Sequence, residues 1–118
     1  MPLSRGVARW VPSAAWMTVI FWLSSRPGSD VPSGIAPYAH FVAYAVLGVL
    51  LLHGLSHPSR WIPAAALASL YGVTDEFHQA FVPGRTPDPM DWAIDTLGAL
   101  VGAALLAWWL ARNGEGAP

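Results

Sequence analysis

Carboxylic acids are concentrated in one part of this sequence, the acidic stretch between Tyr71 and Asp95. All but two of the chain's seven acids lie there, together with one arginine. Long segments without charge flank the stretch on both sides. Ionisable groups in apolar surroundings are unfavourable and usually mark a functional site. We therefore predict a functional site that includes these acids: Asp75, Glu76, Asp88, Asp91 and Asp95.

General acid–base catalysis is one chemistry open to such a site. Neighbouring carboxyl groups in a poorly hydrated site do not ionise together, so one can act as an acid while another acts as a base. A carboxylate would be the general base and a histidine its proton partner, and an arginine would hold an anionic group. The predicted catalytic residues are His40, Asp75, Glu76 and Asp91. The predicted substrate-binding residues are Tyr44, Gln79, Arg85 and Asp95.

Whether this site is an enzyme stays open, because the acidic stretch offers no obvious nucleophile. It has no serine, and Thr74 and Thr86 are weak candidates. Water would have to attack, or a group would have to be transferred directly. A second interpretation is a polar latch that joins helices through buried hydrogen bonds. A third is a divalent metal ion, the one cofactor we consider, whose candidate ligands are His40, Asp75, Glu76, His78, Asp91 and Asp95.

The composition predicts one membrane domain over residues 1–118. Hydrophobic residues make up 54% of the chain and charged residues only 11%, against roughly 25% charged in soluble domains. Most apolar segments lack the polar stripe that a soluble helix needs. A net charge of −1 with scattered arginines excludes a nucleic-acid partner. The absence of cysteine excludes disulfides, thiolate zinc sites and cysteine nucleophiles.

The apolar segments predict an all-α integral membrane bundle with about four transmembrane helices in an up-and-down arrangement. The first helix could instead be a signal peptide, although residues 21–26 lack a cleavage pattern. A loop rich in proline, glycine and serine follows at residues 26–37, and residues 112–118 are expected to be disordered. The predicted helices are 10–25, 37–55, 61–81 and 89–111.

Alternating spans bring the polar residues together at one membrane surface. The start of the second helix, the end of the third and the start of the fourth then lie side by side, so His40 meets the acidic stretch. Four arginines fall on the opposite surface and two on this one. By the positive-inside rule, the termini are expected in the cytoplasm and the site on the outer face of a bacterial cytoplasmic membrane.

Two further features concern the last helix. Asp88 is expected to cap its N-terminus, with Pro89 at the first helical position. Gly98 and Gly102 form a small-xxx-small pattern suited to tight packing. That pattern also allows a homo-oligomer.

Several short motifs occur in an order and spacing that resemble one family. They are His40-Phe41-x-x-Tyr44 with Leu47-Gly48, Asp75-Glu76-x-x-Gln79, Pro83-Gly84-Arg85 and Asp91-x-x-x-Asp95-x-x-Gly98. Over residues 36–111 the chain is similar to the VanZ-like family of small bacterial membrane proteins. It departs from that family where Pro37, Tyr38 and Ala39 replace a common Asp-Lys pair, and where Asp95 replaces a common asparagine.

The resemblance implies a cell-envelope protein related to one that confers resistance to the glycopeptide teicoplanin. We expect it to modify or bind a lipid-linked or cell-wall precursor, or to lower glycopeptide susceptibility, with membrane lipid as a partner. The alternatives are a non-enzymatic accessory or binding protein and a small proton-linked transporter. A site with this excess of acids would repel a lipid phosphate unless Arg85, a protonated histidine or a divalent ion intervened.

Overall fold

The computed structural model describes residues 4–30 and 34–114, and all regular structure within these ranges is helical. The predicted all-α fold is therefore confirmed. Residues 115–118, most of the tail expected to be disordered, and residues 31–33 of the expected loop lie outside the described part. The α-helices are α1 (Arg5–Ala8), α2 (Val11–Ser24), α3 (Ala36–Leu55), α4 (Trp61–Gln79) and α5 (Pro89–Arg112), with 3-10 turns η1 (Gly28–Asp30) and η2 (Pro58–Arg60).

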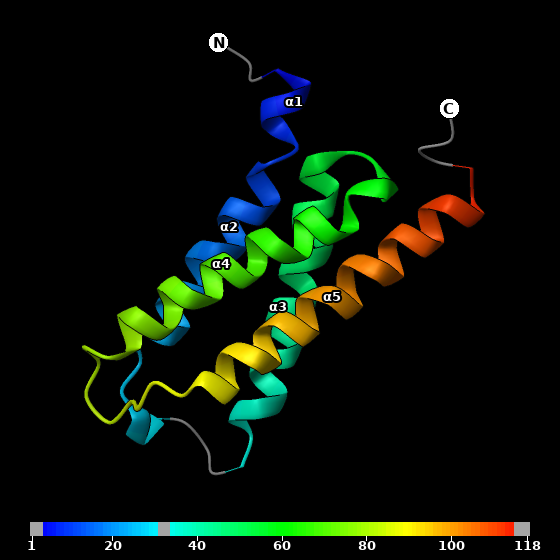
Figure 1. The fold of residues 1–118 in the computed structure, drawn as a ribbon. Coiled ribbons are helices and arrows are strands. Elements are labelled where there is room, and N and C mark those ends of the chain that lie inside the picture. Colours follow the sequence, from blue (N-terminus) through cyan, green and yellow to red (C-terminus); the bar gives the residue numbers. More distant parts are fainter. Residues whose placement is uncertain (1–3, 31–33, 115–118) are drawn as a thin grey trace.

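The long helices run up and down between two ends of the bundle (Figure 1). The first and last described residues lie at one end, together with the turn between α3 and α4. The end of α2, the start of α3, the end of α4 and the start of α5 lie at the other, which we call the polar end. The bounds of α2 to α5 differ from the predicted ranges by at most two residues.

The start of α5 is determined locally by its sequence. Asp88 has an extended backbone, and its side chain accepts a hydrogen bond from the backbone N–H of Met90 at 2.9 Å. Pro89 occupies the first turn, where no backbone donor is needed. The predicted N-cap is confirmed, so Asp88 has a structural role.

The contact between α3 and α5 depends on glycines. A Cβ atom placed on Gly48 would overlap the backbone oxygen of Ala99. On Gly98 and Gly102 it would overlap the backbone oxygens of Phe41 and Ala45. The predicted tight packing is therefore used within the chain, and a second copy would have to bind through a different surface.

Polar side chains attach α2 and α4 to the rest of the bundle. The indole N–H of Trp16 donates to the carbonyl oxygen of Ala43 in α3 at 2.8 Å. The hydroxyl of Tyr71 in α4 donates to the carbonyl oxygen of Met17 in α2 at 2.7 Å. Each bond satisfies a polar group in an apolar part of the protein. Together they set how α2 lies against α3 and α4.

Among the described helices, α3 and α5 are long and apolar enough to cross a membrane. With 14 residues, α2 is about 21 Å long, short of the roughly 30 Å hydrocarbon core. Large apolar side chains are exposed on the outside of the bundle, as expected of a lipid-facing surface, and they include Phe21, Val42, Leu70, Phe77 and Leu105.

Candidate functional site

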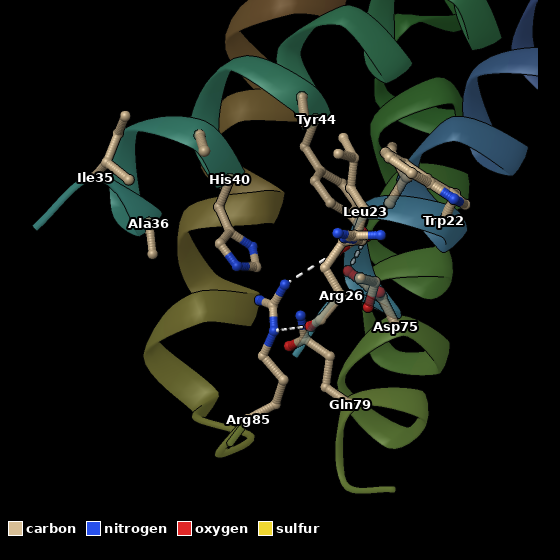
Figure 2. A pocket seen from close by; sticks show the side chains of 14 residues that line it. Trp22, Leu23, Arg26, Ile35, Ala36, His40, Tyr44, Asp75, Gln79 and Arg85 are labelled. Atoms are coloured by element: carbon tan, nitrogen blue, oxygen red, sulfur yellow. Dashed lines mark hydrogen bonds between the residues drawn. The ribbon is translucent and has the colours of Figure 1, made fainter. Parts of the chain in front are cut away.

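A cavity of about 650 Å³ opens at the polar end of the bundle, between α2, α3 and α4. Figure 2 shows His40, Asp75, Gln79 and Arg85 directed toward the same space. The apolar part of its wall comes from α2 and from the start of α3: Ile20, Trp22, Leu23, Ile35, Ala39 and Ala43. The ionisable and hydrogen-bonding groups that line it are Ser24, Arg26, His40, Tyr44, Asp75, Gln79 and Arg85.

His40 and Asp95 form a short polar contact at this end of the bundle. The imidazole Nδ1 lies 2.6 Å from Asp95 Oδ1, with 12% of the His40 side chain exposed and none of Asp95. We predicted a different partner for His40, and a substrate-binding role for Asp95. The close contact of Gly98 with Phe41 explains the difference, because residues 40 and 95 lie within one turn of that contact on α3 and α5.

Asp75 and Tyr44 form a second pair across the cavity wall. The Tyr44 hydroxyl donates to Asp75 Oδ2 at 3.1 Å, and both side chains are buried. Gln79, one turn further along α4, is also buried and lines the cavity. The structure thus brings together three of the predicted site residues on a common wall. The hydrogen-bond partner of Asp75 among the described residues is the Tyr44 phenol and not a histidine or arginine.

Glu76 lies behind this wall, in the gap between α4 and α5. Its Oε2 accepts a hydrogen bond from the backbone N–H of Asp88 at 3.0 Å. Ligand atoms of His40, Glu76 and Asp95 all lie within 4.8 Å of one another. Of the six metal ligands considered from the sequence, these three form the only such group within residues 4–30 and 34–114.

His78 does not join that group. Its ring stacks on Phe21 with centroids 4.3 Å apart, and its Nε2 lies 3.2 Å from Ser25 Oγ. Two residues along a helix correspond to a rotation of roughly 200°. His78 therefore faces α2 while Glu76 faces α5.

Arg85 ties the turn after α4 to the end of α2. Its Nε donates to the carbonyl oxygen of Arg26 at 2.8 Å, and its Nη2 to that of Leu23 at 3.0 Å. These bonds use two of the five guanidinium N–H groups. Arg85 also lines the cavity, so it can serve both the fold and a ligand.

Two lining residues with a hydrogen-bonding side chain, Arg26 and Ser24, were not among the predicted site residues. The Arg26 guanidinium lies 5.1 Å from the centre of the Trp22 ring. Ser24 lines the cavity as well, and its buried hydroxyl has no hydrogen-bond partner among the described residues. Both immediately follow the first apolar segment on the surface where we placed the site. Their position in the sequence was therefore the feature that could have identified them as lining residues.

The charge of the cavity differs from the expected excess of acids. Of the five acids in the acidic stretch, Asp75 is the one that lines it, alongside Arg26 and Arg85. Glu76 and Asp95 lie between helices, and Asp88 caps α5. Asp91, predicted to be catalytic, belongs to neither the cavity lining nor the metal-ligand group found in the described residues. The cavity therefore suits an anion better than the sequence suggested.

This arrangement has two chemical capacities. Cationic groups at the polar end of an apolar cavity can bind an amphiphile with an anionic group. An imidazole held at one nitrogen by a buried carboxylate, as His40 is, can accept a proton at the other. Binding of an anionic amphiphile would use more of the lining residues than proton transfer by His40 would.

Comparison with known protein families gives a match to the family described as VanZ/LLP1, over residues 8–111. No curated protein matches the chain, and no solved structure does. The matched range contains α2 to α5 almost completely, and with them every residue of the site.

Proposed function

The chain belongs to the VanZ/LLP1 family, and from this premise we propose that it acts at the bacterial cell envelope by binding an anionic, lipid-linked molecule. The binding site would be the cavity between α2, α3 and α4. A lipid-linked wall precursor, in which a phosphate or pyrophosphate joins a long apolar chain to a polar unit, has the required chemistry.

The observation that carries this proposal is the pair of arginines at the polar end of a cavity whose wall is mostly apolar. Arg26 and Arg85 both line it, and guanidinium groups bind phosphate through paired N–H donors. Asp75, the one acid in the lining, accepts a hydrogen bond from Tyr44, and the two arginines outnumber it. The amide of Gln79 and the hydroxyl of Ser24 add neutral donors beside the arginines.

The apolar wall supports the lipid part of the ligand. Trp22 and Ile35 line the cavity and are also exposed at the outer surface of the bundle, by 58% and 48%. An acyl or prenyl chain could therefore extend from the cavity between these side chains into the bilayer. Burial of that chain would add to the affinity in proportion to the apolar area covered.

The proposed consequence in the cell is a change in the supply or exposure of wall precursors. Glycopeptide antibiotics bind such precursors, so expression of the chain would lower susceptibility to teicoplanin. Binding alone is sufficient for this role. Chemical conversion of the ligand would add His40 as the general base.

Binding is tested with purified full-length protein in nanodiscs and a polyprenyl monophosphate as the ligand, with the uncharged polyprenol as its matched control. We expect the phosphate to bind more tightly than the alcohol. Replacing both arginines, in R26Q/R85Q, should weaken phosphate binding by at least roughly 100-fold, because two charged hydrogen bonds are lost and each contributes about 1.5–3 kcal/mol. Arg26→Gln alone, which keeps the Arg85 bonds to α2, should give part of this loss.

The matched control is Arg60→Gln, at the opposite end of the bundle in η2. Its phosphate affinity should equal that of the wild type. Equal binding of the alcohol and the phosphate, or an equal loss in Arg60→Gln, would refute an anion site at Arg26 and Arg85. Conversion of the phosphate during the assay would identify an enzyme.

The proposed orientation places the cavity at the outer face and the termini in the cytoplasm. The chain has no cysteine, so single cysteines can report on each end. Thr86 is exposed in the connection from α4 to α5, at the polar end, and Asn113 is exposed directly after the last residue of α5, at the opposite end. On intact cells, a membrane-impermeant maleimide should label Thr86→Cys and should label Asn113→Cys only after lysis. The reverse pattern would place the cavity in the cytoplasm and rule out an extracellular ligand.

A further inference from the structure

The gap between α3, α4 and α5 behind the cavity contains a second group of polar residues, and we propose that it binds a divalent transition-metal ion. One ligand atom from each of His40, Glu76 and Asp95 lies within 4.8 Å of the others. The three residues come from three different helices. An ion held there would join all three helices at the polar end of the bundle.

In each carboxylate of this group, one oxygen contacts a donor group of the protein and the other has no hydrogen-bond partner among the described residues. Glu76 Oε2 accepts from the backbone N–H of Asp88, and Asp95 Oδ1 contacts the imidazole of His40. Glu76 Oε1 and Asp95 Oδ2 are buried and have no hydrogen-bond partner among the described residues. Buried carboxylate oxygens without a partner are unfavourable. A cation bound by both oxygens would remove that penalty.

The orientation of Asp95 supports a shared ligand. A Cβ atom placed on Gly72 would lie 3.2 Å from Asp95 Oδ2. Gly72 and Glu76 are four residues apart in α4 and therefore lie on one face. The unpartnered oxygen of Asp95, whose side chain is fully buried, thus lies against the face of α4 that carries Glu76. Glycine at position 72 keeps that space free of a side chain.

The donor set indicates the class of ion. One imidazole and two carboxylates favour a borderline ion such as Zn²⁺ or Mn²⁺ over Ca²⁺ or Mg²⁺, which prefer oxygen ligands alone. The Asp88 N–H would act as an outer-shell donor that orients Glu76, a common feature of metal sites. Three protein ligands leave a coordination position for water. His40 also lines the cavity, so the ion would be bound one side chain away from it, and a His40 ring that holds the ion would no longer act as a general base.

The test uses full-length protein in detergent micelles, stripped with a chelator and then dialysed against Zn²⁺, Mn²⁺ or Mg²⁺. We expect the wild type to bind one Zn²⁺ or Mn²⁺ per chain and to bind Mg²⁺ more weakly. Glu76→Gln and Asp95→Asn should each lower the affinity at least about tenfold. Asp91→Asn is the comparison variant, since it removes a nearby charge at the start of α5 but no atom of the ligand group, and its loss of affinity should be much smaller than that of Glu76→Gln.

Folding of every protein is checked by a melting curve in chelator. If Asp95→Asn does not fold, Glu76→Gln decides, since its side chain is only partly buried. If neither folds, the wild type decides, because a bound ion must raise its melting temperature progressively as the free ion concentration exceeds the dissociation constant. A folded wild type that binds none of the three ions, or an equal loss of affinity in Glu76→Gln and Asp91→Asn, would overturn the site. Lipid binding is measured separately in chelator, so either proposal can fail without the other.

Discussion

Gly102→Ala is expected to destabilise the protein by about 3 kcal/mol, the upper part of the usual range for overpacking. The added Cβ would overlap the backbone oxygen of Ala45 in α3, and a backbone atom cannot turn aside as a side-chain end can. Alanine in a helix otherwise stabilises relative to glycine by about 0.5–1 kcal/mol. The clash is the larger effect, so the sign of the change should be a loss. The measurement is the free energy of unfolding in micelles.

The matched control for this substitution is Gly6→Ala in α1, where an added Cβ meets no atom within 4 Å. Its stability should equal or slightly exceed that of the wild type. Gly98→Ala should behave like Gly102→Ala, since its Cβ would overlap the backbone oxygen of Phe41. Wild-type stability in Gly102→Ala would show that α3 and α5 separate easily. The pairing of His40 with Asp95 would then lose its structural explanation.

Gly28→Ala should weaken binding of the polyprenyl phosphate at least about tenfold, although Gly28 does not line the cavity. Its backbone N–H donates to the carbonyl oxygen of Pro83 at 3.0 Å, and an added Cβ would overlap the backbone oxygen of Gly84. The turn after α4 must then move away from the end of α2. Arg85, the next residue in that turn, would lose its hydrogen bonds to Leu23 and Arg26.

Two measurements separate this effect from general unfolding. Affinity for the phosphate is compared in Gly28→Ala and Gly6→Ala, and melting curves are recorded for both. We expect a loss of affinity only in Gly28→Ala, with much of its stability kept, since the contact joins two turns and not two long helices. Wild-type affinity in Gly28→Ala would mean that the position of Arg85 does not control the ligand. The anion site would then rest on Arg26.

Much of the fold follows from local sequence. Long apolar segments separated by proline and glycine predict four helices to within two residues at each end, because helix length and breakers are local properties. The Asp88 cap likewise depends only on its neighbours in the chain. Up-and-down connectivity is enough to bring His40 to the same end of the bundle as the acidic stretch. The family motifs indicate which polar residues belong to the site, but they do not show which of these residues contact each other.

Which polar side chains contact each other depends on the rotation of each helix about its own axis. Only the tertiary structure determines that rotation. Each residue turns a helix face by roughly 100°, so a small rotation exchanges one neighbour for another. The glycine contacts of α5 on α3 fix that rotation, and they pair His40 with Asp95 while Asp75 meets Tyr44.

The same rotation divides the acids between the cavity and the gap behind it, while the turn geometry brings Arg26 and Arg85 to the cavity. The sequence by itself determined the helices, the polar end and the family. The charge of the cavity and the candidate metal ligands came only from the packing, because both depend on contacts between residues far apart in the chain.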